Sequence, residues 1–214
     1  MAYALIVAPH LLWGALVTIQ LVLASAVGIL AVGLLISLAK LSRWMIIRLP
    51  AKVYVDFARS IPLLVMLFLV VFSLPGLGLK LPVFWAGVLG LVLYYGAYEA
   101  EICRSGILAI DKGQIEAAVA LGMRPVQVLR RITLPQALRV ALPPTGSLFI
   151  GTLKGSAQVA VVALPELLRT GQDLAVSSGR FLTIYLMVTL VYLGMTFLIS
   201  TGVGILERKL RIHD

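Results

Sequence analysis

Charged residues are scarce in this 214-residue sequence: Asp, Glu, Lys and Arg together make up 13% of it, whereas 61% of the residues are hydrophobic. Soluble domains carry about 25% charged residues on average, so this composition excludes an ordinary soluble domain and places the chain in a lipid bilayer. Residues 1–39 contain no Asp, Glu, Lys or Arg at all. They therefore lack the basic segment with which a cleavable signal peptide begins, and we expect their hydrophobic part to be retained as a membrane span.

Residues suited to catalysis or metal binding are equally few. The one cysteine, Cys103, excludes a disulfide within the chain. The two histidines, His10 and His213, lie near opposite ends of the chain, and the topology below puts them on opposite sides of the membrane. The phosphate-binding pattern G-x-x-x-x-G-K-[ST] does not occur. We therefore expect no catalytic site, no metal and no cofactor in this chain, and ATP, if it drives the process, must be bound by another chain.

Five hydrophobic segments are long enough to cross a bilayer as helices, which takes about 20 residues each. They comprise residues 11–39, 60–79, 81–98, 140–165 and 181–206. A cluster of Pro and Gly residues between the second and third segments predicts a tight turn. Because no internal repeat or second domain is evident, the sequence predicts an all-α, polytopic membrane bundle of five transmembrane helices, forming a single domain over residues 1–214.

Lys and Arg residues gather on one side of this predicted topology. With the N-terminus outside the cell, those facing the cytoplasm are Lys40, Arg43, Arg48, Lys52, Arg104, Lys112, Arg124, Arg130, Arg131, Arg139, Arg208, Lys209 and Arg211. Only Lys80, Arg169 and Arg180 then lie outside. Cytoplasmic loops of membrane proteins are enriched in Lys and Arg, so the N-terminus is predicted outside and the C-terminus inside. The net charge of +9 then reflects orientation and contact with anionic lipid, and it needs no nucleic acid partner.

The longest polar interval, residues 99–139, predicts a helical hairpin in the cytoplasm. Residues 114–121 are rich in helix formers, and Gly122 can end that helix with a positive φ. Pro125 suits the first turn of a second helix over residues 126–132, which we expect Pro135 to end. Such a short, partly apolar hairpin has little to pack against within its own chain, so we expect it to dock into a partner.

The spacing of seven residues in this hairpin matches a family signature. An EAA triplet, a glycine and an I-x-LP sequence are formed by Glu116, Ala117, Ala118, Gly122, Ile132, Leu134 and Pro135. This pattern resembles the permeases of ATP-binding cassette (ABC) importers. The flanking residues 98–104 and 134–139, and residues 59–63 at the second span, look like the polar amino acid branch of that family.

The resemblance implies a function for the chain and a set of partners. The chain would be the permease subunit of an ABC importer, carrying polar amino acids across the bacterial inner membrane by alternating access. Its coupling loop, residues 104–139, would insert into a separate cytoplasmic ATPase. Two such ATPases would bind ATP and Mg, and a second permease subunit, identical or homologous, would complete the complex. A periplasmic or extracellular binding protein would deliver the substrate.

Polar residues within the fourth span are the first candidates for the substrate pathway. Ser147, Gly151, Lys154 and Gln158 recur at helical spacing and form one stripe, with Ser156 beside it. An ionisable group in a span is costly, so Lys154 is expected to serve the pathway, or else to form an interhelical hydrogen bond or reach the lipid interface. The family often shows K-D-T-S-L here, whereas this chain has Gly155 in place of the Asp. This departure removes a carboxylate that could bind a substrate ammonium group.

A second group of candidates lies at the start of the second span. Arg59, Ser60 and Pro62 could form a gate or a scaffold. Asp56, three residues before Arg59, could pair with it, and Pro62 could break the helix. Near the end of the third span, Glu99 is expected in a solvated interfacial network with its neighbours, residues 101 and 104. Residues 165–180 are expected to be an outer loop or a short interfacial helix.

Two further functions stay open on the sequence. A permease for another small polar solute is the first, since the region around Lys154 departs from the family pattern. A non-transporting membrane channel or interaction subunit is the second. The coupling signature discriminates against the latter, because a channel has no need for it.

Overall fold

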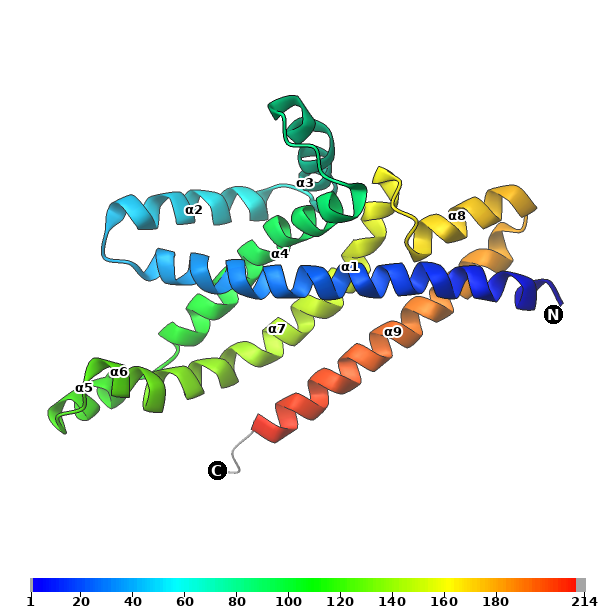
Figure 1. The fold of residues 1–214 in the computed structure, drawn as a ribbon. Helices are drawn as coiled ribbons and strands as arrows, with labels where there is room; N and C mark the ends of the chain where they lie inside the picture. Colours follow the sequence, from blue (N-terminus) through cyan, green and yellow to red (C-terminus); the bar gives the residue numbers. More distant parts are fainter. Residues whose placement is uncertain (1, 211–214) are drawn as a thin grey trace.

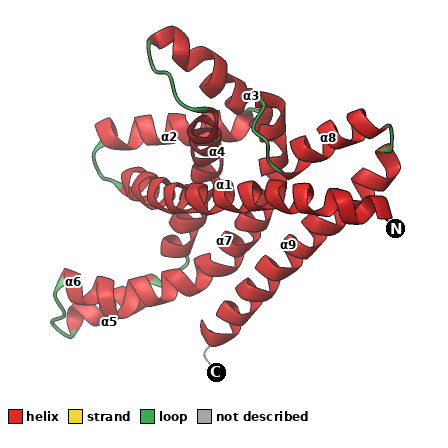
Figure 2. Ribbon diagram, turned by 45° about the vertical axis from the view of Figure 1, so that its right-hand side comes forward, coloured by secondary structure: helices red, strands yellow, loops and turns green. Residues whose placement is uncertain are grey.

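The computed structural model describes residues 2–210, which form helices joined by short turns (Figures 1 and 2). The helices are α1 (Ala2–Leu41), α2 (Met45–Ser60), α3 (Leu63–Phe68), α4 (Val83–Leu108), α5 (Lys112–Ala120), α6 (Pro125–Val128), α7 (Leu134–Ser156), α8 (Leu167–Ser178) and α9 (Phe181–Leu210). The predicted all-α fold is confirmed. Arg211 and His213, which the predicted topology places in the cytoplasm, lie outside the described residues.

Three helices are each long and apolar enough to cross a membrane: Leu5–Leu41 of α1, the whole of α4, and Phe181–Arg208 of α9. Two further spans are helix pairs with a bend between them. Met45–Ser60 meets Leu63–Leu77 at 114°, and Pro125–Val162 meets Leu167–Ser178 at 51°. The described chain is therefore a helical membrane bundle with three to five spans, and the predicted five are reached when each bent pair is counted as one.

The second span, predicted over residues 60–79, consists of two helical segments and begins earlier, in α2. Ser60 ends α2, and Ile61 is extended, with φ −105° and ψ 152°. The ring of a proline disfavours a helical conformation of the residue before it, so Pro62 breaks the helix at Ile61. The chain then continues as α3 and closes at Gly78, whose φ of +84° is left-handed. The predicted break at Pro62 and the predicted turn before α4 are both present.

Helices α1 and α4 pack closely along much of their length (Figure 1). Glycines allow this approach: a Cβ added to Gly28 of α1 would lie 2.5 Å from a methyl group of Val92. In the same way, a Cβ on Gly96 of α4 would lie 2.9 Å from a methyl group of Val32. The valine side chains fill the space that a larger residue at either glycine would need, so the two glycines let α1 and α4 pack closely.

Buried polar contacts join the helices deeper in the bundle. Glu99 of α4 is only 2% exposed, and both of its carboxylate oxygens accept from the Thr145 hydroxyl of α7, at 2.9 and 3.1 Å. The expectation of a solvated Glu99 is therefore wrong, because α7 covers it. Glu101, two residues further along α4, pairs with Lys40 of α1 and with Arg104 at 2.7 Å, as an interfacial network would.

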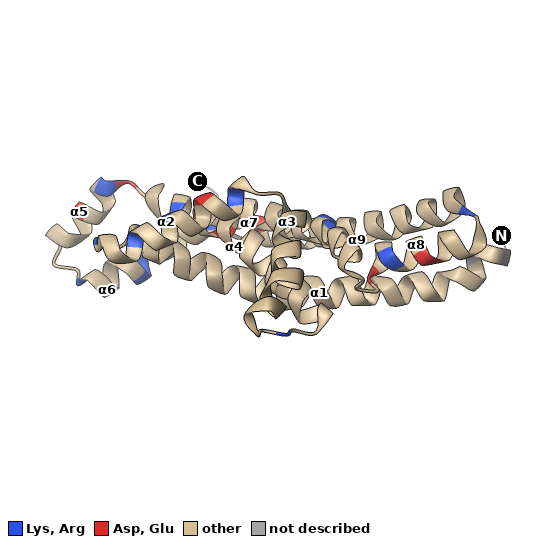
Figure 3. Ribbon diagram, turned by 90° about the horizontal axis from the view of Figure 1, so that it is seen from above, with Lys and Arg blue, Asp and Glu red and all other residues tan. Residues whose placement is uncertain are grey.

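Charged residues are most frequent toward one end of the bundle, and fewer lie along the rest of it (Figure 3). Lys and Arg residues colour the end formed by α2, α5 and α6, and a smaller group lies with α8 near the N-terminus (Figure 3). Helices α5 and α6 extend beyond the rest of the bundle, at the junction of α4 and α7 (Figure 1). This arrangement leaves the tip of the hairpin clear of the spans that it connects.

Candidate functional site

The hairpin of α5 and α6 is built by local hydrogen bonds. Asp111 caps α5, since its Oδ1 accepts from the backbone N–H of Gly113 at 2.6 Å. Gly122 follows α5 with a φ of +78°, as predicted. Gln127 then accepts from the backbone N–H of Arg124 at 2.8 Å, and Pro125 occupies the first turn of α6. These contacts hold a tight turn between two helical arms.

The surface of this hairpin is unusually apolar for an exposed element. Ala118 and Val128 are buried, whereas Val119, Val126 and Leu121 are exposed, the last at 83%. Exposed apolar side chains at a protruding tip are typical of a surface that another protein covers. The hairpin can therefore present a compact apolar tip to a partner.

The seven signature residues occupy distinct places on the hairpin. Glu116 and Ala117 are exposed on α5, Ala118 is buried beneath them, and Gly122 forms the turn. Ile132 is half-buried in a π-helical turn, and Leu134 and Pro135 begin α7, exposed and half-buried respectively. A side-chain hydrogen bond of 2.7 Å from Gln136 to Gln114 ties α7 back to α5.

Pro135 does not end the second arm, so that prediction is wrong. The backbone of Thr133 and Leu134 is helical, and the chain continues into α7 without a turn. The π-helical turn Leu129–Thr133 comes directly before the proline. Its wider winding, together with the place of Pro135 in the first turn of α7, accommodates the missing N–H. A movement of the hairpin would therefore be transmitted along a continuous helix.

A first cavity lies between α4 and α7 and has a volume of about 450 Å³. This tyrosine cavity is lined by Tyr94, Tyr95, Tyr98, Pro144, Ser147, Leu148 and Gly151. The hydroxyl of Tyr95 donates to the Gly151 carbonyl at 2.9 Å, and the hydroxyls of Tyr94 and Tyr98 lie 3.3 Å apart. Arg59 of α2 lies over the Tyr98 ring, 5.2 Å from its centroid. The structure thus brings Arg59, Ser147 and Gly151 to one place.

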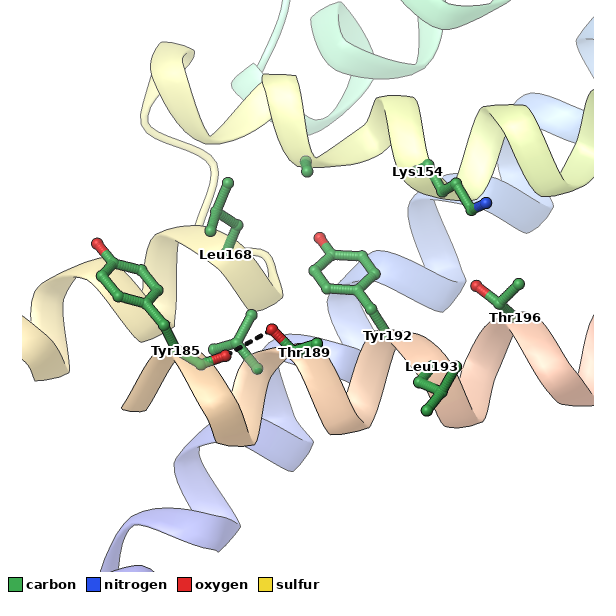
Figure 4. A pocket seen from close by; sticks show the side chains of 9 residues that line it. Lys154, Leu168, Tyr185, Thr189, Tyr192, Leu193 and Thr196 are labelled. Atoms are coloured by element: carbon green, nitrogen blue, oxygen red, sulfur yellow. Dashed lines mark hydrogen bonds between the residues drawn. The ribbon is translucent and has the colours of Figure 1, made fainter. Parts of the chain in front are cut away.

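A second cavity, of about 440 Å³, lies between α7, α8 and α9 (Figure 4). This lysine cavity is lined by Lys154, Ala157, Leu168, Tyr185, Val188, Thr189, Tyr192, Leu193 and Thr196. Lys154 extends from α7 toward α9, where tyrosine and threonine hydroxyls follow one another along the helix (Figure 4). Ser147 and Lys154 lie about two helical turns apart, which places them on the same face of α7 and about 10 Å from each other along its axis. The two cavities therefore follow each other along one face of that helix.

The other predicted pathway residues line neither cavity. The Ser60 hydroxyl donates to the Asp56 carbonyl at 2.6 Å, and Pro62 forms the break after α2. Ser156 is fully buried and donates to the Leu153 carbonyl at 2.7 Å. Gln158 is exposed in the 3₁₀ turn that follows α7. The predicted stripe is thus divided between the two cavities and the turn beyond them.

Several residues of the site were missed by sequence reasoning. Three tyrosines at positions 94, 95 and 98 of a predicted span were a usable signal, because polar aromatic side chains inside a span need hydrogen-bond partners. Glu166 was placed in an outer connection, yet it is fully buried before α8. Its carboxylate accepts from the Tyr192 hydroxyl at 2.8 Å and from the Arg169 N–H at 2.8 Å. The segment that follows is the helix α8 rather than a loop.

Comparison with known proteins agrees with this architecture. Residues 29–212 match the family described as "binding-protein-dependent transport system inner membrane component". The probable amino-acid ABC transporter permease protein YckA of Bacillus subtilis (strain 168) is 38% identical over 178 residues, which cover 83% of this chain and 79% of that protein. The probable glutamine ABC transporter permease protein GlnM of the same organism is 40% identical over 157 residues, 73% of each chain. A crystal structure described as an amino acid ABC transporter with histidines has a TM-score of 0.88 and 36% identity, covering 94% of both chains.

Proposed function

The chain belongs to the family of binding-protein-dependent transport system inner membrane components, in its polar amino acid ABC transporter branch, and we propose that it carries polar amino acids into the cell by alternating access. It is a multi-pass permease subunit of the bacterial inner membrane, and the ATPase of its ABC transporter complex is a separate subunit. The proposal concerns the substrate, the partners and the residues that couple ATP hydrolysis to transport.

The apolar tip of the α5–α6 hairpin is the observation that carries the proposal. Leu121 and Val126 are exposed there together with Glu116, so the hairpin offers apolar side chains and a carboxylate to a cleft in the ATPase. We assign the seven signature residues to this coupling contact. Two ATPase subunits would bind ATP and Mg, and their closure would push the hairpin and, through the continuous helix, α7.

A second permease subunit, identical or homologous, would complete the pathway. Ser147 and Lys154 lie on an exposed face of α7, and polar groups on such a face are costly against lipid. A facing subunit would shield them and enclose the two cavities between the subunits. The candidate pathway residues are then Arg59, Ser147, Gly151 and Lys154, while a binding protein would deliver substrate from outside.

The proposed orientation puts the N-terminus outside and the α5–α6 hairpin in the cytoplasm. The basic residues at the hairpin end of the bundle support it (Figure 3). The loop between α3 and α4 and the helix α8 then face outward. This orientation brings the hairpin to the side of the membrane where ATP is available, and no nucleic acid is needed to explain the basic charge.

Co-purification with the neighbouring gene products tests the proposal. In mild detergent, we expect an ATPase to purify with the chain, and a liganded binding protein to stimulate its ATP hydrolysis. Glu116→Lys should reduce the amount of bound ATPase and the stimulated hydrolysis at least about tenfold, since the charge at the coupling contact is inverted. Glu207→Lys, the same change near the end of α9 and outside the hairpin, serves as the control.

Two results would count against the proposal. A chain that purifies alone and stimulates no ATPase would point to a channel or interaction subunit. A Glu116→Lys variant that retained full association and stimulation would remove the carboxylate from the coupling contact.

A further inference from the structure

Each of the two cavities along α7 has a positively charged side chain at it. Lys154 lines the lysine cavity, and Arg59 lies over Tyr98 at the tyrosine cavity. Both side chains are exposed. The ion pairs among the described side chains involve neither of them, and the expected Asp56–Arg59 pair is absent from these. The charge of both cations is therefore available to a ligand.

The carboxylates that the structure describes do not form the walls of these cavities. Among the described residues, the side chains that line them include no Asp or Glu. Glu99 is buried against Thr145, and Glu101 is held in an ion pair. Glu166 is buried behind the wall of the lysine cavity, where its carboxylate already accepts from the hydroxyl of the lining Tyr192 at 2.8 Å. Asp56 is exposed on α2 and lines neither cavity. A cationic ligand would therefore meet hydroxyls and aromatic rings, but no acidic partner.

Position 155 explains why an acidic side chain is absent between the cavities. A Cβ added to Gly155 would overlap the hydroxyl oxygen of Tyr95 and lie 2.9 Å from a methyl group of Leu63. The Tyr95 hydroxyl is itself fixed by its hydrogen bond to the Gly151 carbonyl. The space that a carboxylate would need is therefore filled by a phenol, and the surroundings of the pathway are set by Lys154 and Arg59.

We propose that these cavities accept amino acids with uncharged or acidic side chains and discriminate against those with cationic side chains. This inference rests on the proposed function and names the substrate class of its pathway. The α-carboxylate of any amino acid is attracted to the fixed cations, and the tyrosine and threonine hydroxyls can bind the α-ammonium group. A second positive charge on the substrate is repelled without an acidic group to offset it. We expect discrimination on the order of tenfold or more.

Substrate binding to the transporter complex without its binding protein tests this selectivity. The permease would be purified with its ATPase subunits and placed in nanodiscs without the binding protein, so that the selectivity of that protein does not contribute. Equilibrium binding of radiolabelled glutamine, glutamate, arginine and lysine would then be compared. We expect glutamine and glutamate to bind at least about tenfold more tightly than arginine and lysine. Lys154→Glu should reverse the order, and Lys154→Gln should reduce the ratio.

Lys80→Glu is the matched control, because Lys80 is exposed in the loop before α4 and lines neither cavity. Retained ATPase association would show that each variant is folded. Equal or tighter binding of arginine or lysine to the native complex would overturn the inference, as would a ratio that Lys154→Glu leaves unchanged. If no amino acid bound while stimulated ATP hydrolysis persisted, the selectivity site would be refuted and the proposed function would stand. A complex without any stimulated ATPase would instead refute the proposed function.

Discussion

Tyr192→Phe should destabilise the packing of α8 against α9 by removing one hydroxyl. That hydroxyl donates to Oε2 of Glu166 at 2.8 Å and connects α9 to the N-terminus of α8. The same carboxylate accepts from the Arg169 N–H at 2.8 Å and from the Thr18 hydroxyl of α1 at 3.3 Å. Removing one partner of a buried hydrogen bond costs about 1–3 kcal/mol. Since two donors remain on the carboxylate, we expect the lower half of this range, about 1.5 kcal/mol.

The assay is equilibrium unfolding of the purified permease by SDS titration in mixed micelles, followed by tryptophan fluorescence. Tyr185→Phe is the matched control, because Tyr185, like Tyr192, lines the lysine cavity from α9, but it is 38% exposed. It should change the free energy of unfolding by less than about 0.5 kcal/mol. If both variants lost the same stability, the Tyr192–Glu166 contact would not hold α8 and α9 together.

Two further substitutions test the packing of α1, α4 and α7. Gly28→Leu should cost about 1–3 kcal/mol or more in the same unfolding assay, because its Cβ would lie 2.5 Å from a Val92 methyl group, whereas Gly194→Leu on α9 meets open space and should be nearly neutral; equal effects of the two would contradict this packing. Thr145→Val removes the hydroxyl that donates to both oxygens of buried Glu99 and should cost about 1–3 kcal/mol of unfolding free energy. An unchanged stability would show that Glu99 finds another donor.

Features encoded by neighbouring residues could be predicted from the sequence. The α5–α6 turn depends on Gly122 and Pro125, whose backbone preferences act locally whatever the rest of the fold does. The break at Pro62 follows from the same kind of local constraint. Hydrophobic length predicted the single spanning helices α1, α4 and α9, since the bilayer sets the length of a helix that crosses it.

Features that depend on contacts between distant helices could not be predicted in this way. Glu99 and Thr145 are 46 residues apart, and Thr18 and Glu166 are 148 apart. Nothing in the residues around Glu99 or Glu166 shows that another helix covers it. The tyrosine cavity likewise needs the crossing of α4 and α7. Pro135 was mispredicted because the π-helical turn before it depends on how α7 continues from the hairpin.

Transport itself tests the central claim most directly. The permease would be reconstituted with its ATPase subunits in proteoliposomes, with ATP enclosed in the vesicles and the binding protein added outside. Only complexes whose ATPase subunits face the vesicle interior can then take up substrate. We predict movement of radiolabelled glutamine that requires ATP and the binding protein and is lost in Glu116→Lys. Movement that continues without ATP, or none with any amino acid while the ATPase turns over, would contradict the account.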